Sequence, residues 1–166
     1  TDLGTDTVYL YEYHPDAATE VLKLKNTISL QAGSGPRHLT FSKDGKKVYV
    51  LQELNGAISV FDFDNGKLTK IQETTILAKD FKGNFTGADI HISPDGKWIA
   101  YISFEDDIDP TQHPGCKPVS LKLIPTMGGF PKTIAYLYGG QGTINTPSWS
   151  PDSKFIAFVS YSGSAK

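Results

Sequence analysis

The sequence predicts an all-β fold, and three observations support this prediction. A five-residue turn motif occurs three times, at Ser42–Lys46, Ser93–Lys97 and Ser150–Lys154. The Pro, Asp and Gly found in it are typical of tight turns, because Pro presets φ, Asp bonds to its own backbone and Gly accepts a positive φ. Short β-branched and aromatic runs flank each copy, as in a β-hairpin. No segment has a sustained helical period.

The spacing of the motif indicates a repeat. Its copies are 93 − 42 = 51 and 150 − 93 = 57 residues apart. Repeats of about 40–50 residues with four strands each are typical of β-propeller blades. We therefore expect four-stranded blades, with strands A to D counted outward from the central axis, and we expect the motif to join strand A to strand B.

The first half of the chain should supply six strands. Aromatic and β-branched residues on both sides of the His14-Pro15-Asp16 turn predict two strands, at 8–13 and 21–30. The turn signals Lys43-Asp44-Gly45, Asn55-Gly56 and Asp64-Asn65-Gly66 then separate four β-type runs. The strands expected from these runs cover 37–41, 47–52, 57–63 and 68–77.

The second half should supply six more strands. A loop at 78–87 precedes four β-type runs, and a Gly-rich stretch at 139–142 precedes the last pair. The strands expected here cover 89–92, 98–103, 119–124, 132–137, 146–149 and 155–160. In order, the chain reads C-D, A-B-C-D, A-B-C-D and A-B, which is three blades' worth of strands.

This order predicts one propeller half, residues 1–166, that closes with a second copy of itself. Residues 1–30 would give strands C and D of a shared blade, 36–77 and 88–137 would give complete blades, and 144–160 would give strands A and B of a shared blade. Three blades form an open half-circle with apolar faces at both ends. We therefore expect a homodimer that exchanges its end strands and closes a six-bladed ring.

Composition excludes several classes of partner. The formal charge is 16 − 18 = −2, which gives no basic surface for nucleic acid and no polybasic patch for a membrane. The apolar runs have strand length, and the first residues do not form a signal peptide. Cys116 is the only cysteine, which excludes an intrachain disulfide and a cysteine-based zinc cluster. No cofactor is expected, and the compartment stays open.

Two groups of motifs resemble known propeller families. Residues 2–96 resemble the seven-bladed lactonase family of the 6-phosphogluconolactonase and carboxymuconate cyclase type. The motifs that carry this resemblance are Asp2-Leu3-Gly4-Thr5-Asp6, Gly35-Pro36-Arg37-His38, Gln52-Glu53-Leu54 and Ala88-Asp89-Ile90-His91-Ile92-Ser93-Pro94-Asp95-Gly96. Residues 92–166 resemble the six-bladed TolB-like propeller, through 93–101 and Pro147-Ser148-Trp149-Ser150-Pro151-Asp152 with the following 153–158.

The lactonase resemblance implies a candidate catalytic pair. Arg37 and Glu53 match the family's active-site arginine and glutamate. An Arg fork binds carboxylate or phosphate, and a carboxylate can act as a base near a lactone. Two family features are missing. The blade portion that carries the family's catalytic histidine is not in this chain, and Ser103-Phe104-Glu105 stands where the family has Asn-Arg-Gly.

Other candidate ligands are weaker. His38 and His91 would lie in strand A of consecutive blades, and with Arg37 they are candidate binding residues. A metal site would need a third converging ligand, so a structural role at the inner strands is expected for both histidines rather than metal binding. The loop at 105–116 is rich in carboxylates but lacks EF-hand spacing, so no metal is expected there.

From these observations the leading prediction is a chimeric or designed scaffold. The two resemblances share the Ser-Pro-Asp-Gly turn at 93–96, which suggests a recombination point. We therefore expect a self-assembling propeller with no natural activity. The alternatives are a lactone hydrolase of the 6-phosphogluconolactonase type that uses Arg37 and Glu53, and a module that binds a peptide or a small anion at the channel mouth.

Overall fold

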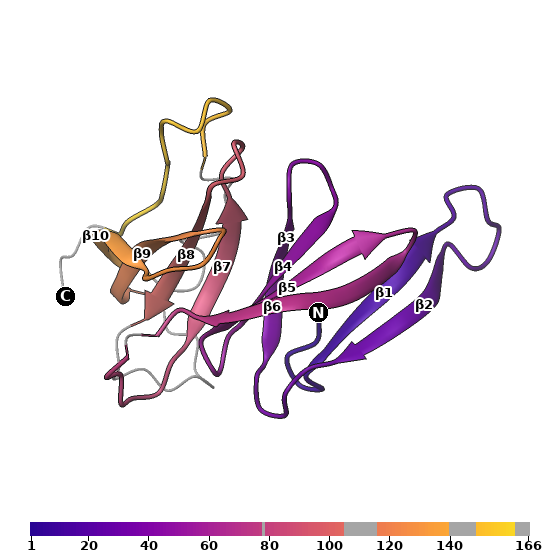
Figure 1. The fold of residues 1–166 in the computed structure, drawn as a ribbon, viewed down its shortest axis with the longest axis horizontal. Coiled ribbons are helices and arrows are strands. Elements are labelled where there is room, and N and C mark those ends of the chain that lie inside the picture. The colour runs from indigo at the N-terminus through magenta and orange to yellow at the C-terminus, as the bar shows by residue number, and fades with distance from the viewer. Residues whose placement is uncertain (78, 105–115, 140–148, 162–166) are drawn as a thin grey trace.

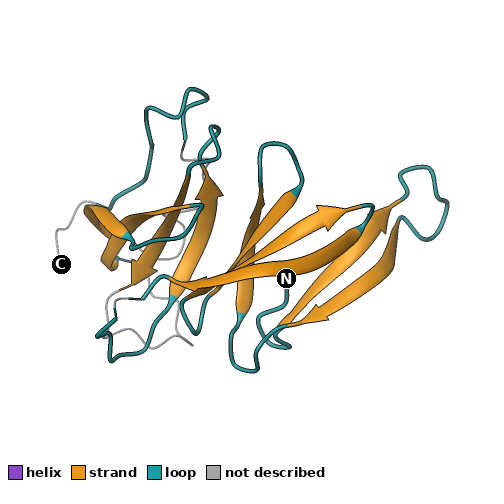
Figure 2. Cartoon of the chain, viewed as in Figure 1, coloured by secondary structure: helices purple, strands orange, loops and turns teal. Residues whose placement is uncertain are grey.

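The computed structural model describes residues 1–77, 79–104, 116–139 and 149–161. These ranges contain ten β-strands and no helix, which confirms the all-β class (Figure 2). Nothing in the described ranges therefore qualifies as a membrane-spanning helix.

The strands form three sheets that follow one another along the chain (Figure 1). The first sheet has two strands and the other two have four each, and every strand pairs antiparallel with its sequence neighbour. The strands are β1 Thr7–Tyr13, β2 Leu22–Ser29, β3 Pro36–Phe41, β4 Lys47–Gln52, β5 Ala57–Asp64, β6 Lys67–Thr75, β7 Gly87–Ile92, β8 Trp98–Phe104, β9 Lys117–Pro125 and β10 Lys132–Gly139. Consecutive four-stranded sheets of this kind are consistent with a fragment of a β-propeller.

The repeated turn motif folds in the same way in all three copies. In each copy the Ser carbonyl accepts a hydrogen bond from the N–H three residues later, at 2.8–2.9 Å. The Ser Oγ donates to the Asp carboxylate at 2.6 Å, and that carboxylate also accepts the N–H of the Lys that ends the motif. These bonds, led by the Ser hydroxyl, hold the pKa of Asp44, Asp95 and Asp152 below the usual range.

Apolar side chains fill the space between consecutive sheets. The largest cluster joins the two four-stranded sheets, with Leu51 and Ile58 from one and Ile90 and Tyr101 from the other. Each of these side chains is almost fully buried, and such burial contributes about 1.5–3 kcal/mol for a large apolar side chain. This packing places β3 and β7, the inner strands of the two sheets, side by side (Figure 1).

The predicted strand at 155–160 is wrong. Ile156 pairs with Trp149 in an isolated bridge, and the rest of the segment has no strand structure. The other residues predicted to pair with it, 146–148, lie outside the described residues. Tyr161 instead donates its N–H to the Tyr138 carbonyl at the end of β10, at 2.8 Å. β-propensity alone does not hold a strand, which needs a neighbour along its length.

Candidate functional site

Arg37 and Glu53 form an ion pair at one edge of the β3–β6 sheet. Arg37 lies near the start of β3 and Glu53 directly follows β4, so the antiparallel hairpin brings them together. Arg37 Nη1 donates to Glu53 Oε2 at 2.9 Å. The Glu53 side chain is 1% exposed and the Arg37 side chain is 32% exposed. We call this edge, where β3 and β7 begin and β4 ends, the site rim.

The N-terminal segment fixes the turn that leads into Arg37. The Asp6 carboxylate accepts the N–H groups of Gly35 at 2.8 Å and Gly33 at 2.7 Å. These two amides hold the pKa of Asp6 below its usual range. Gly35 has a φ of +61°, and a Cβ at this position would lie 2.6 Å from Leu54 Cγ. Both the conformation and the space at the turn therefore require glycine.

The backbone of Glu53 is held from both sides. Its N–H donates to the Gly35 carbonyl at 2.8 Å, within its own sheet. Its carbonyl accepts the N–H of Gly87 at 3.2 Å, and Gly87 is the first residue of β7 in the next sheet. The carboxylate is therefore placed where two blades meet.

A polar network supports the end of β4 beside Glu53. The fully buried Gln52 side chain donates to Ser59 Oγ at 2.7 Å and to Glu73 Oε2 at 2.9 Å. Burial raises the pKa of Glu73, but hydrogen bonds from Lys70, Ser59 and Gln52 outweigh burial and leave that pKa below its usual range. A satisfied buried network of this kind gives β4 one defined position.

Both inner strands have a β-bulge at the site rim. The register of β3 with β4 shifts at Arg37, and the register of β7 with β8 shifts at Asp89. Asp89 also has a φ of +57°, a left-handed conformation that Asp adopts more readily than most residues. Bulges change the direction of side chains and are frequent beside active sites.

Asp89 binds the two predicted histidines. Its backbone N–H donates to Nδ1 of His38 on the neighbouring strand β3, at 3.2 Å. Its Oδ2 lies 2.6 Å from Nε2 of His91, two residues further along β7. The site rim therefore brings together Arg37, His38, Glu53 and His91, all four of the residues that the sequence singled out.

His38 lies at the centre of this group. Burial lowers its pKa below the usual value of 6.5, and the charges of Arg37 and His91 act in the same direction. The carboxylates of Asp89 and Glu53 act in the opposite direction but do not compensate. The imidazole is therefore neutral at neutral pH.

Several cavities lie along the described sheets, and one of about 650 Å³ is lined by residues of the first two turn motifs, among them Asp44 and Asp95. Another, of about 380 Å³, is lined by Leu54, Asn55, Leu77, Gly83, Asn84 and Phe85. Leu54 and Asn55 directly follow Glu53 in the chain, but neither Arg37 nor Glu53 lines this cavity.

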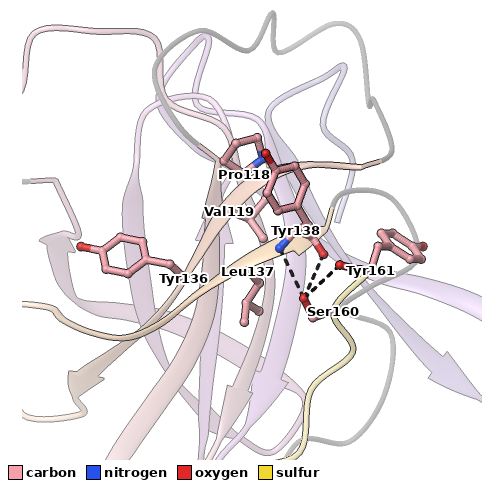
Figure 3. Close-up of a pocket in the computed structure, with 7 residues that line it drawn as sticks. All are labelled: Pro118, Val119, Tyr136, Leu137, Tyr138, Ser160 and Tyr161. Carbon is pink, nitrogen blue, oxygen red and sulfur yellow. Dashed lines mark hydrogen bonds between the residues drawn. The ribbon is translucent and has the colours of Figure 1, made fainter. Parts of the chain in front are cut away.

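A further cavity, also about 380 Å³, lies over the outer strands β9 and β10 (Figure 3). Its lining residues are Pro118, Val119, Tyr136, Leu137, Tyr138, Ser160 and Tyr161. Figure 3 shows the Tyr136 ring directed away from the other side chains, and Ser160 hydrogen-bonded to the backbone of Tyr138 and Tyr161. None of its lining side chains is charged at neutral pH, so it is less suited to an anionic substrate than the site rim.

The described residues contain no group of three or more His, Cys, Asp or Glu side chains that could hold a metal ion. Most of the acidic loop considered above, residues 105–115, lies outside the described residues. Cys116 at its end is exposed.

Comparison with known proteins identifies the family. A family model described as lactonase, seven-bladed β-propeller, matches residues 1–106. That match covers well over half of the chain. The chain belongs to this lactonase family.

Individual relatives agree with this assignment. A 6-phosphogluconolactonase of Formosa agariphila is 35% identical over 151 residues, which cover 84% of this chain and 41% of the relative. The periplasmic gluconolactonase structure of Pseudomonas aeruginosa has a TM-score of 0.65 at 25% identity, over 94% of this chain and 41% of that one. This chain therefore spans about two fifths of the length of these relatives.

The TolB resemblance concerns the fold alone. A structure from Agrobacterium tumefaciens described as TolB has a TM-score of 0.60 at 21% identity, over 98% of this chain and 57% of that one.

These comparisons correct the leading prediction from the sequence. The expectation of no natural activity is wrong, because relatives and structural neighbours are named 6-phosphogluconolactonase or gluconolactonase. A chimeric or designed origin is not supported either, since one relative aligns across the supposed junction at 93–96. The two apparent resemblances reflect repeats that many propellers share.

Sequence reasoning missed two residues of the site, Asp89 and Asp6. A signal for Asp89 was present, because residues two apart in a strand point to the same face and Asp89 stands two before His91. Asp6 ends one of the motifs that carry the lactonase resemblance, but its contacts to Gly33 and Gly35 span 27 and 29 residues and could not be read from that motif.

Proposed function

We propose that this chain is part of a lactone hydrolase of the 6-phosphogluconolactonase type, with Arg37 and Glu53 at its site. The observation that carries this proposal is the 2.9 Å ion pair between a buried carboxylate and a partly exposed guanidinium. The names of the relatives support the substrate class, which is a phosphorylated or unphosphorylated sugar lactone.

The chemistry of the pair suits this reaction. In hydrolysis, water adds to the lactone carbonyl carbon, the bond from that carbon to the ring oxygen breaks, and a proton passes from water to the ring oxygen. Glu53 is the proposed group that takes the proton from water and returns it. Arg37 gives one of its five N–H donors to Glu53, and its other donors can bind the negatively charged oxygens of the substrate.

Burial favours these roles. The Glu53 side chain is shielded from bulk solvent, so its attraction to the charge of Arg37 is only weakly screened. The hydrogen bonds of Asp6 and Gly87 fix the two halves of the pair before substrate arrives. Such preorganisation is the main source of electrostatic catalysis.

The proposal is tested by measuring hydrolysis of 6-phosphogluconolactone above the spontaneous rate. We expect saturable hydrolysis that falls about 100-fold in kcat/KM in Arg37→Ala, as for loss of a donor to a developing negative charge. Lys47→Ala is the matched control, because it removes an exposed ion pair to Asp62 on the same sheet. A rate no higher than the spontaneous one, or equal effects of both variants, would contradict the proposal.

We also propose that the chain assembles as a homodimer. The pairs Tyr11–Leu24 and Tyr13–Leu22 of the first sheet are between 49% and 67% exposed, and at the other end of the described chain Phe155 is 71% exposed. Apolar surfaces of this kind favour association. A second copy that covers both ends would close a ring of six blades.

A further inference from the structure

We propose that His38 acts as a neutral hydrogen-bond donor to an anionic or carbonyl oxygen of the substrate, and that Asp89 is the positioning residue that fixes its tautomer. The donor role rests on the proposed function, whereas the tautomer of His38 is inferred from the structure independently of that function.

The tautomer follows from hydrogen-bond chemistry. A backbone N–H can only donate, so His38 Nδ1, which faces the Asp89 N–H at 3.2 Å, must be unprotonated. The proton of the neutral imidazole is then on Nε2. Addition of a second proton would place an N–H opposite an N–H, so this contact also opposes a cationic His38.

The bulge at Asp89 explains why its N–H is available. Ala88 pairs with Ile102 and Ile90 pairs with Tyr101, so Asp89 is an extra residue without a partner position on β8. The left-handed φ directs its N–H across to β3, in the neighbouring blade. Non-glycine residues in this conformation cluster at functional sites.

The Asp89 side chain has a separate task. Its Oδ1 accepts the N–H of Ile90 at 3.0 Å, which supports the local turn, and its Oδ2 lies against His91 Nε2. One residue thus places an N–H against one histidine and a carboxylate against the other. The backbone positions His38 and the side chain positions His91, and the two functions can be separated by substitution.

His38 directly follows Arg37 on β3, and its ring is close enough to the proposed catalytic pair for both charges to affect its pKa. The charged groups around it are Asp89, Arg37, Glu53 and His91, which include both members of the proposed catalytic pair. A neutral donor in this position binds a negative oxygen without competing with Arg37 for Glu53, whereas an imidazolium would pair with the carboxylate.

The tautomer is tested without any ligand, by long-range ¹H–¹⁵N NMR of the histidine side chains at pH 7.5. We expect His38 to carry its proton on Nε2. In Asp89→Gly the glycine readily adopts the positive φ and still has a backbone N–H, so His38 should keep its proton on Nε2. Asp89→Val strongly disfavours that φ, so the tautomer should become mixed. A proton on Nδ1 or a charged His38 in the unaltered protein would overturn the inference, even if Asp89→Val fails to fold.

The donor role is tested by titration with 6-phosphogluconate. His38→Ala should weaken binding about 10-fold or more, as for loss of a hydrogen bond to a charged group. His38→Gln places an amide N–H near the position of Nε2 and should restore most of the affinity. Unchanged affinity in His38→Ala would overturn the donor role. No binding by the unaltered protein would overturn the proposed function and the donor role together, while the NMR result would still decide the role of Asp89.

Discussion

His38 shows how position sets the charge of a side chain. Its ring lies among four charged groups, yet burial lowers its pKa and keeps it neutral. The unfolded chain would protonate near pH 6.5. Between the folded and the unfolded pKa, the unfolded state therefore binds more protons than the folded state.

This difference predicts how stability depends on pH. The contribution of His38 is fully present above about pH 6.5 and is lost as the pH falls through its lower folded pKa. We expect the free energy of unfolding, measured by urea denaturation from pH 7.5 to pH 5, to fall with pH. The fall should be smaller in His38→Gln, which does not titrate. An identical slope in both proteins would contradict the assignment of a neutral, buried His38.

The sequence singled out residues with a distinctive chemical pattern, and the structure brings them together. Arg37 and Glu53 could be found because two motifs of the lactonase resemblance contain them, and their contact follows from the hairpin that joins β3 and β4. The role of Asp89 depends on a bulge and on a contact to the neighbouring blade. Neither property is encoded in local propensity, so the sequence alone could not give it.

At the scale of elements, the turn motif is the most predictable part of the chain. The four strands next to the first two copies were predicted within about two residues, whereas next to the third copy the described residues contain no strand. Pro, Asp and Gly act locally, which is why their effect can be predicted. The prediction for the segment at 155–160 failed because a strand needs a neighbour along its length, and among the described residues its strand pairing is limited to the bridge between Ile156 and Trp149.

The motif gives a matched pair of variants. Ser93 is fully buried, and its Oγ accepts the N–H of Trp98 at 3.0 Å, whereas the equivalent Ser42 is partly exposed. Ser93→Ala removes the acceptor of the Trp98 N–H and the donor to Asp95 at a buried position, and should lower the free energy of unfolding by about 1–3 kcal/mol. Ser42→Ala should cost less, because water can replace the lost hydroxyl. If urea denaturation gave equal losses of unfolding free energy for Ser93→Ala and Ser42→Ala, burial of the serine would not determine the size of the loss.

The turn before Arg37 gives a second matched pair. Gly35 and Gly33 both have a positive φ, but a Cβ at Gly35 would lie 2.6 Å from Leu54 Cγ, while one at Gly33 would have nothing within 4 Å. Gly33→Ala should cost about 1–2 kcal/mol through its φ alone. Gly35→Ala should cost clearly more and should also weaken 6-phosphogluconate binding. Thermal unfolding of both variants tests this, and a smaller cost at Gly35 would contradict the described turn.

At the scale of the whole molecule, three sheets in sequence leave two apolar ends. The exposed Tyr11, Tyr13, Leu22 and Leu24 face away from the β3–β6 sheet, whose contact with the first sheet is made by Val8 and Ile28. Because the blades repeat, consecutive sheets pack in the same way, and this packing could be predicted from the sequence. The repeat of the turn motif does not show which surface packs against the exposed apolar residues at the two ends.

We predict that a second copy provides this cover. Light scattering coupled to size exclusion should then give twice the chain mass of 18.1 kDa at micromolar concentration. Lys substitutions at Tyr13 and Leu22 should shift the protein to a single-chain mass, because they place charges in the contact. A stable single-chain mass for the unaltered protein would contradict the homodimer.

The central claim is that Arg37 and Glu53 form a lactone-hydrolysing site, and the most direct test is steady-state hydrolysis of 6-phosphogluconolactone by Glu53→Gln. This variant keeps the shape of the side chain and removes its ability to accept a proton. The account predicts a fall in kcat of about 100-fold or more with KM changed by less than about threefold. A kcat equal to that of the unaltered protein would contradict it.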